Sequence, residues 1–482
     1  MKKLCLILIG ILFPVFLQAQ VTLAEKQGMP TDVLALQLDT FVQKNLPKGA
    51  YAGIMAYDLT SGKLLYAHDA DKLCRPASNM KLLTSITALS LPQSESPFRT
   101  EVWYQGEIVG DTLHGNVYVV GGFDPEFDEE ALMSFTDAVD SLHVKVIDGL
   151  LIGDVSAKDS LYWGTGWIWD DNPGSYQPYL SPLMLNKGVV NIEATAGNAG
   201  EPAMLEVTPY SSFYSVHNQT VSKTASAGKF KVDRNWLEND NQITVSGNVA
   251  RKSSGSVNVY NSNGFFMHTW NDQLRKRGIE VTGGYDIGEL MKNDSTYLLA
   301  SFETPMQDVL NQMMKESDNL NAEAMLWRIG AQSTGKKHVS AEDCLEVVKS
   351  LIGKMGLKAT DYRLADGCGL SNYDYLSPEL LVAFLKYAYN NKSIYRRLNE
   401  SLPIGGIDGT LKNRMGRGTP SFRVVHAKTG SITGVYCLSG YLKNKGGHDI
   451  AFAIMNQNGL SATTARRFQD KLCDLLITLS LD

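Results

Sequence analysis

The fold is constrained most by a change in secondary-structure pattern in the middle of the chain. Residues 98–287 consist mainly of short β-type runs separated by Gly and Asn turns, such as GNVYVVGG, VKVIDGLLIGD, NQITVSGNV and SGSVNVY. On both sides of this stretch, helical patterns alternate with strand patterns. At 482 residues, the chain is also longer than one hydrophobic core usually serves. We therefore expect one α/β domain made from both ends of the chain, with a largely β insertion of roughly two hundred residues inside it.

The spacing of apolar residues assigns several helices and strands. Residues 31–46 fit a short amphipathic helix, and residues 51–68 fit a β-hairpin that turns at Ser61-Gly62. Further helical patterns cover residues 263–278, 305–329, 340–355 and 377–390, and strand patterns cover VVHAKTGSITGVYCLSGYLKN and DIAFAIMNQ. An amphipathic helix follows at residues 462–479, which either packs on a sheet as a core helix or touches a membrane surface.

The first twenty residues have the three-part layout of a secretory signal peptide. Lys2 and Lys3 form a basic start, residues 4–17 form an apolar run, and Gln18-Ala19-Gln20 provides a small-residue exit. The apolar run is short for a bilayer span, and an uncleaved membrane anchor is the alternative. We expect residues 1–19 to be a signal peptide. The mature chain is then periplasmic or otherwise exported, with at most peripheral membrane contact.

Charge and cysteine content exclude several classes of protein. The formal net charge of −6 and the pI near 5.8 do not provide the basic face that nucleic-acid binding needs. Of the six cysteines, Cys5 lies in the apolar run, and the other five are widely spaced with no Cys-x-x-Cys pair: Cys74, Cys344, Cys368, Cys437 and Cys473. The sequence allows one disulfide without indicating which cysteines would form it. It gives no support to a disulfide framework or to a zinc site. The sequence contains no His-Glu-x-x-His, and we expect no metal and no cofactor.

Three short motifs follow one another along the chain. Ser78-Asn79-Met80-Lys81 is Ser-x-x-Lys, Ser317-Asp318-Asn319 is Ser-x-Asn, and Lys428-Thr429-Gly430 is Lys-Thr-Gly. The first pattern also occurs by chance at Ser226–Lys229 and Ser333–Lys336. Only Ser78 is followed directly by an apolar run of helix formers, so it should lie at or near a helix start. The ordered triplet, with each member in a suitable setting, carries the functional interpretation.

These motifs provide the groups for nucleophilic catalysis by serine. Residues i and i+3 share one face of a helix, so Lys81 can bring its amine to the hydroxyl of Ser78. A serine hydroxyl needs a base, and a lysine can serve when burial and a nearby positive charge lower its pKa. Lys428 is a candidate for that charge and for binding a substrate carboxylate. Ser317 can relay a proton to a leaving amine, and Asn319 can hydrogen-bond Lys81 and a substrate amide.

The third motif offers backbone groups to an extended peptide. A strand that carries Thr429 and Gly430 can pair with a substrate by strand addition, and Gly430 leaves the space for it. The backbone N–H groups of Ser78 and Ser431 would form an oxyanion hole. The alternative is that Ser78 only caps a helix and Lys428 only lies in solvent on a strand.

The motifs resemble those of penicillin-binding proteins and serine β-lactamases. Four more stretches resemble one family in particular, the D-alanyl-D-alanine carboxypeptidase/endopeptidases or class C low-molecular-mass penicillin-binding proteins. They are Gly121-Gly122-Phe123-Asp124-Pro125, Gly166-Trp167-Ile168-Trp169-Asp170-Asp171, Asp366-Gly367-Cys368-Gly369-Leu370-Ser371 and Ile407-Asp408-Gly409-Thr410-Leu411. The long gap between Ser78 and Ser317 matches as well, since this family carries two extra domains there.

This resemblance implies an α/β (α+β) serine β-lactamase/transpeptidase-like catalytic domain with two inserted, mainly β domains. It places the catalytic domain at residues 20–97 and 295–482, the second domain at 98–187 and 245–294, and a nested third domain at 188–244. It also implies D,D-carboxypeptidase and D,D-endopeptidase activity on peptidoglycan peptides, with acylation of Ser78 by β-lactams.

The resemblance also suggests how a substrate side chain is bound. In the family, the second Asp of the Trp-x-Trp-Asp-Asp motif binds the free amine of diaminopimelate, which here is Asp171, with Tyr176 as a neighbour. Asp171 alternatively only caps a turn. Two departures leave the side-chain preference open: the family usually has Ser at the position of Cys368, and often has Arg at that of Asn372. Phe123 replaces a third small residue in the glycine stretch, away from the motifs.

Two other functions use the same residues. A β-lactamase or esterase would employ the same serine, and sustained hydrolysis of nitrocefin rather than a stoichiometric burst would favour it. A non-catalytic scaffold or β-lactam sensor would keep the fold without turnover. Release of D-alanine from muropeptides separates an enzyme from such a scaffold.

Overall fold

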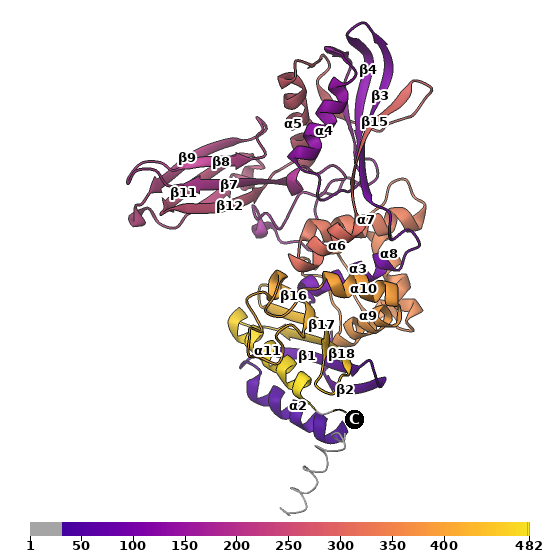
Figure 1. The fold of residues 1–482 in the computed structure, drawn as a ribbon, viewed down its shortest axis with the longest axis vertical. Helices are drawn as coiled ribbons and strands as arrows, with labels where there is room; N and C mark the ends of the chain where they lie inside the picture. The colour runs from indigo at the N-terminus through magenta and orange to yellow at the C-terminus, as the bar shows by residue number, and fades with distance from the viewer. Residues whose placement is uncertain (1–30, 480, 482) are drawn as a thin grey trace, which may run out of the picture.

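A five-stranded antiparallel sheet built from both ends of the chain forms the base of the molecule (Figure 1). The structure is a computed structural model that describes residues 31–479 and 481, so the predicted signal peptide at residues 1–19 lies outside the described residues. The strand order is β16-β17-β18-β1-β2. These strands are β1 (Tyr51–Asp58), β2 (Lys63–His68), β16 (His426–Ile432), β17 (Val435–Lys443) and β18 (Asp449–Gln457).

The centre of this sheet joins segments that are far apart in the sequence. Strand β18 is apolar and buried along nearly its whole length, as a strand covered on both faces must be. It pairs with β1 from Tyr51 opposite Gln457 to Asp58 opposite Ile450. The hairpin β1–β2 and the last three strands therefore belong to one sheet.

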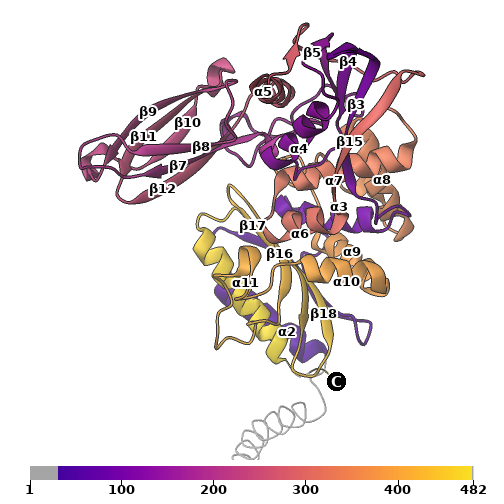
Figure 2. The same cartoon turned by 45° about the horizontal axis from the view of Figure 1, so that its top comes forward.

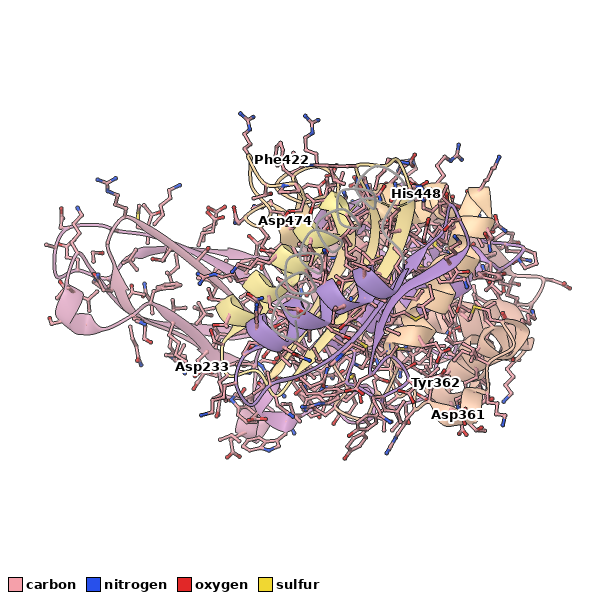
Figure 3. The ribbon with its side chains drawn as sticks, turned by 90° about the horizontal axis from the view of Figure 1, so that it is seen from below. Asp233, Asp361, Tyr362, Phe422, His448 and Asp474 are labelled. Carbon is pink, nitrogen blue, oxygen red and sulfur yellow. The ribbon has the colours of Figure 1, made fainter. Side chains whose placement is uncertain are left out.

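Two helices cover one face of the sheet. Helices α2 (Thr31–Asn45) and α11 (Ala462–Thr478) bury Leu38, Phe468 and Leu472 against its strands. Figures 2 and 3 show both helices on this face, and Asp474 marks α11 in Figure 3. The amphipathic face of α11 is thus core, as one of the two alternatives states. Among residues 31–479, no helix is both long and apolar enough to traverse a bilayer.

A layer of helices covers the other face of the sheet (Figure 2). It contains α3 (Met80–Leu89), α6 (Met306–Lys315), α7 (Asn319–Thr334), α8 (Ala341–Lys354), α9 (Pro378–Asn390) and α10 (Lys392–Ser401). Every residue of α3 is buried, because this helix lies in the middle of the layer. The sequence patterns did not indicate α10, whose segment KSIYRRLNES is polar and buries only four residues.

The insertion begins with a seven-stranded sheet that stands above the helical layer (Figure 1). Its main path is β13-β5-β4-β3-β15, and β6 and β14 extend it. The strands are β3 (Phe98–Val109), β4 (Thr112–Val120), β5 (Val146–Asp148), β6 (Leu151–Asp154), β13 (Glu280–Val281), β14 (Tyr285–Ile287) and β15 (Thr296–Thr304). Helices α4 (Glu129–Asp140) and α5 (Ser262–Lys276) pack against it and share its core.

Two three-stranded sheets project to one side of this unit (Figure 1). Their orders are β12-β7-β8 and β10-β11-β9. The strands are β7 (Val189–Thr195), β8 (Met204–Thr208), β9 (Ser215–Ser222), β10 (Lys231–Arg234), β11 (Gln242–Val249) and β12 (Lys252–Asn258). The observed fold is thus a mixed α/β base that carries mainly β insertions.

Strand pairing suggests where the inserted units end. Residue 244 lies inside β11, and β12 pairs with β7 along its whole length, so we propose that the nested domain extends to Asn258. Strand β15 pairs with β3 up to Thr304 opposite Phe98. We therefore propose that the second domain ends at Thr304, ten residues beyond the expected boundary at residue 294.

The core of the second domain provides a stability test. Trp270 is fully buried beside Phe135, and its indole N–H has no hydrogen-bond partner in the described part of the chain. Trp270→Ala should lower the free energy of unfolding by about 3–5 kcal/mol, because it leaves a large cavity. Trp270→Phe should cost clearly less, since it keeps most of the ring and removes the unpaired N–H. Urea unfolding followed by circular dichroism measures both, and equal losses would contradict this account.

Candidate active site

Ser78 lies in a tight turn at the start of the central helix. The turn is a 3-10 segment, Ala77–Asn79, that leads directly into α3. The backbone of Ala77 has a φ of 45°, and the loop at Gly369 lies so close that a Cβ there would come within 1.8 Å of the Ala77 carbonyl oxygen. Ser78 is therefore at a helix start, as predicted, and its position is fixed by close backbone packing.

Lys81 lies one turn further along and is completely buried. Its Nζ is 3.0 Å from Ser78 Oγ. It donates hydrogen bonds to Asn319 Oδ1 at 2.7 Å and to the Cys368 carbonyl oxygen at 2.8 Å. Burial lowers the pKa of Lys81, because the charged ammonium loses its hydration.

These contacts suit a neutral amine that acts as a base. A neutral amine has two N–H groups and one lone pair. Two of the three neighbours of Lys81, Asn319 Oδ1 and the Cys368 carbonyl, are pure acceptors and take the two N–H groups. The lone pair then faces the Ser78 hydroxyl, which is the geometry that proton abstraction requires.

The Ser-x-Asn motif interrupts a helical segment. The sequence pattern indicates helix throughout residues 305–329, but the structure divides it into α6 and α7 at Ser317, whose φ is 64°. A left-handed conformation costs roughly 1–2 kcal/mol for a residue with a side chain. Asp318 offsets part of that cost by capping α7, since its Oδ1 accepts from the backbone N–H of Asn321 at 3.0 Å.

This break directs Ser317 toward the third motif. Lys428 Nζ donates to Ser317 Oγ at 2.8 Å and to the Thr429 carbonyl oxygen at 3.0 Å. Burial lowers the pKa of Lys428 well below its usual value, and protonation of Lys81 lowers it further. The five residues of the three motifs thus meet in one place: Ser78, Lys81, Ser317, Asn319 and Lys428.

The strand that carries Lys-Thr-Gly is an edge strand. β16 is the last strand of its sheet. Its start pairs with Ile404 through His426, and the part of its outer edge beyond that bridge is available to an added peptide. A Cβ at Gly430 would lie 2.7 Å from the Pro76 carbonyl oxygen and 3.0 Å from the Ser78 nitrogen. Only glycine lets this strand approach the nucleophile turn so closely.

A cleft of about 340 Å³ opens at Ser78. Asp171, Tyr176 and Ser431 line it together with Ser78, Ser317 and Asn319. Tyr176 donates its hydroxyl to Asp171 Oδ1 at 2.9 Å, and its carbonyl oxygen accepts from Asn319 Nδ2 at 2.7 Å. Burial raises the pKa of Asp171 above its usual value, although the bond from Tyr176 opposes this. The structure therefore brings both residues to the cleft that holds Ser78.

A second hollow of about 410 Å³ also begins at Ser78. It is lined by Thr429, Gly430, Arg414 and Arg466 among others. Thr429 Oγ1 donates to Thr410 Oγ1 at 2.7 Å, which joins the Lys-Thr-Gly strand to the Ile407–Leu411 stretch. Ser78 thus lies between two hollows, one with a carboxylate and one with guanidinium groups.

Two features of the site were missed from the sequence. One is the Cys368 carbonyl that receives a hydrogen bond from Lys81. The other is Glu323, a fully buried acid whose Oε1 accepts from the N–H groups of Gly367 and Cys368 at 2.8 and 2.9 Å. Burial, and then the charge of Asp366, raise the pKa of Glu323 to about 8. The one available signal was the lone acid of the α7 segment, four residues after Asn319.

Asp366 holds the same loop from its other side. Its oxygens accept from the backbone N–H groups of Gly369 and Ser371 at 2.6 and 2.7 Å and from Trp167 Nε1 at 2.8 Å. Ligand atoms of Glu323, Asp366 and Cys368 lie within 4.8 Å of one another. Their carboxylates are engaged by backbone donors, and burial raises the pKa of the Cys368 thiol, so this group fits loop support better than a metal site. All five cysteines of the described region are buried and free.

Comparison with known proteins identifies the family. A profile described as the D-Ala-D-Ala carboxypeptidase 3 (S13) family matches residues 34–479. The chain belongs to this family. It is therefore a serine-type peptidase, and the resemblance found in the sequence is confirmed.

Curated relatives and solved structures agree with this assignment. The chain is 30% identical over 435 residues to D-alanyl-D-alanine carboxypeptidase DacB of Haemophilus influenzae, covering 87% of this chain and 89% of the relative. It is 28% identical over 488 residues to D-alanyl-D-alanine carboxypeptidase of Actinomadura sp., covering 98% and 89%. The crystal structure of penicillin-binding protein 4 from Haemophilus influenzae superposes with a TM-score of 0.78 at 28% identity, covering 91% of this chain and 98% of that one. The predicted transpeptidase-like fold is thus confirmed.

The contact between Gly430 and the Ser78 turn can be tested. Gly430→Ala should slow acylation of Ser78 by a fluorescent penicillin about tenfold to hundredfold, because the added Cβ pushes β16 away from the nucleophile. Gly416→Ala is the matched control, since a Cβ there meets nothing within 4 Å. Stopped-flow fluorescence measures both rates, and an unchanged rate in Gly430→Ala would contradict the close approach.

Proposed function

We propose that this S13 family member hydrolyses D-alanyl-D-alanine bonds in peptidoglycan stem peptides through an acyl-enzyme on Ser78. The observation that carries the proposal is the buried Lys81 amine, which two carbonyl acceptors orient toward Ser78 Oγ at 3.0 Å. β-Lactams, which are cyclic amides, acylate the same hydroxyl. In support, a β-lactam complex exists for penicillin-binding protein 4 of Haemophilus influenzae, which is 25% identical to this chain and superposes with a TM-score of 0.74.

Acylation begins when Lys81 takes the hydroxyl proton of Ser78. Oγ attacks the carbonyl carbon of the scissile bond, and the carbonyl oxygen becomes an oxyanion. The backbone N–H groups of Ser78 and Ser431 stabilise that charge. Asn319 holds Lys81 through Oδ1 and has its Nδ2 at the cleft.

The leaving amine needs a proton before the C–N bond breaks. The Ser317 hydroxyl, which is hydrogen-bonded to Lys428 Nζ, relays to this amine the proton that Lys81 took from Ser78, so Ser317 keeps a proton and Lys81 returns to the neutral amine. Lys428 and Thr429 also bind the carboxylate of the leaving D-alanine. Neutral Lys81 then takes a proton from water, whose oxygen attacks the ester carbonyl. The same proton passes to Ser78 Oγ as the ester C–O bond breaks, which releases the shortened peptide and restores the Ser78 hydroxyl.

Asp171 and Tyr176 select the side chain of the acyl donor. The carboxylate of Asp171 accepts a hydrogen bond from Tyr176, and an ammonium group on a diamino acid fits beside it. Thr433, Ile432 and Leu370 line the rest of this cleft, so it also accommodates an aliphatic stem. The substrate is therefore a stem peptide with an aminoalkyl side chain.

The enzyme also acts as an endopeptidase on crosslinks. In that reaction the leaving amine belongs to a second stem peptide, which is bulkier than D-alanine. The hollow beyond Thr429 supports this proposal, because it provides about 410 Å³ of space and the guanidinium of Arg466 for an additional carboxylate. Export, predicted from residues 1–19, would bring the enzyme to this substrate.

The catalytic role of Ser78 has a direct test. Ser78→Ala should reduce D-alanine release from a stem pentapeptide by at least about a thousandfold and abolish labelling by a fluorescent penicillin, because no hydroxyl remains to be acylated. Ser333→Ala is the matched control, since Ser333 belongs to a chance Ser-x-x-Lys match at the exposed end of α7. Retained release in Ser78→Ala, measured by chromatography of the products, would refute the proposal.

The substrate role of Asp171 has a separate test. Asp171→Ala should lower kcat/KM for a peptide with a side-chain ammonium about tenfold to hundredfold, since a hydrogen bond to a charged group is worth about 1.5–3 kcal/mol. Acylation by a penicillin without an amine should stay unchanged. Asp170→Ala, at the exposed neighbouring position, serves as the control. Equal losses for the peptide and the penicillin would contradict a recognition role.

A further inference from the structure

A lysine of the insertion reaches the Ser-x-Asn motif of the catalytic domain. Lys187 lies between the second and nested domains, in a short turn (Asn186–Gly188) immediately before β7. Its backbone is left-handed, with a φ of 59°. Its Nζ donates to Asp318 Oδ2, to Asn321 Oδ1 and to Glu126 Oε1, at 2.9, 2.9 and 2.8 Å.

Asp318 is the middle residue of Ser-x-Asn. One of its oxygens caps α7 through the N–H of Asn321, and the other accepts from Lys187. Its two sequence neighbours make the catalytic contacts, Ser317 with Lys428 and Asn319 with Lys81. Any rotation of Asp318 therefore moves both neighbours.

Asn321, two residues after Asn319, also accepts a hydrogen bond from Lys187. It is fully buried, and its Nδ2 donates to Glu126 Oε1 at 2.6 Å and to the Val309 carbonyl oxygen at 3.2 Å. Lys187, Glu126 and Asn321 thus form a closed ring of hydrogen bonds. Although burial opposes it, the charges of Asp318 and Glu126 raise the pKa of Lys187, which keeps it an ammonium.

The turn that presents Lys187 is itself anchored in the insertion. The Asn186 side-chain oxygen accepts from the backbone N–H of Glu129, and the backbone N–H of Asn186 donates to the Phe127 carbonyl. The Gly188 carbonyl accepts from the N–H of Val259 at 2.9 Å, which ties the turn to the end of the nested sheet. The insertion therefore fixes the turn, while Asp318, Asn321 and Glu126 hold the ammonium that the turn presents.

We propose that Lys187 is a positioning residue for catalysis that holds Asp318 in place. With Asp318 fixed, Ser317 on one side of it reaches Lys428, and Asn319 on the other side reaches Lys81. The clamp makes the insertion part of the catalytic apparatus rather than only a substrate-binding attachment. This inference rests on the proposed acyl-enzyme function. Misplacement of two catalytic side chains by about 1 Å can cost about a hundredfold in rate.

The test compares acylation rates in purified full-length protein. Lys187→Met should slow both acylation by a fluorescent penicillin and kcat for D-alanine release about tenfold to hundredfold, with KM little changed. Lys158→Met is the matched control. Lys158 is a buried lysine of the insertion whose side-chain amine donates to Asp159 and to the Leu161 carbonyl and lies over the Trp327 ring. Its loss should lower the melting temperature and leave acylation as in the wild type.

A chemical rescue separates positioning from general stability. Lys187→Cys should be as slow as Lys187→Met, and alkylation with 2-bromoethylamine should restore most of the rate by returning an amine at nearly the same reach. Wild-type protein treated in the same way controls for the native cysteines, of which the five in the described residues are buried. This variant also provides the test if Lys187→Met does not fold.

Acylation of the wild-type protein tests the proposed function, and the ratio of variant to wild type tests the clamp. Slow acylation in Lys187→Met, with rescue after alkylation, supports the clamp. A rate equal to that of wild type or of Lys158→Met overturns it. Alkylation that restores the melting temperature but not the rate overturns it as well.

Discussion

Burial of the Lys81 amine is the interaction on which the rest of the catalytic domain depends. A lysine without water keeps its charge poorly, so the fold must supply acceptors for its N–H groups and leave the lone pair free. Those acceptors come from Asn319 and from the Cys368 carbonyl, which lie on different segments. The helical layer that surrounds α3 excludes water from Lys81 and from the Cys368 carbonyl. The chemistry at Ser78 is therefore a consequence of packing.

The loop behind Lys81 shows how much support one acceptor needs. A backbone carbonyl can aim at an amine only if its peptide is held. Glu323 and Asp366 hold this loop by accepting its N–H groups, and Gly369 allows it to pass the Ala77 carbonyl at close range. The charge of Asp366 also limits how far the pKa of Lys81 falls, because it favours the ammonium. The residues that set the pKa of Lys81 through burial and charge thus lie on α3, on α7 and in this loop.

Sequence reasoning predicted most elements and all three motifs, and its errors have physical causes. The polar segment of α10 forms a helix because the layer around it buries Ile394 and Leu398, which its composition does not indicate. The break at Ser317 lies inside a strong helical pattern, because the contact with Lys428 and the cap at Asp318 outweigh local helix propensity. No sequence motif indicated the contributions of Glu323 and of the Cys368 carbonyl, since a backbone carbonyl has no sequence signature.

The amino-acid sequence by itself predicted the chemical groups of the candidate active site, the helix that joins Ser78 to Lys81, and a base that carries an insertion. These depend on local spacing and on periodicity, which a linear pattern records. Only the tertiary structure decided that Asn319 and Asp171 line the same cleft, that Lys428 bonds Ser317 beside it, and that Lys187 reaches Asp318 from the insertion. The reason is that contacts between distant segments depend on how sheets and helices pack. No residue spacing encodes that arrangement directly.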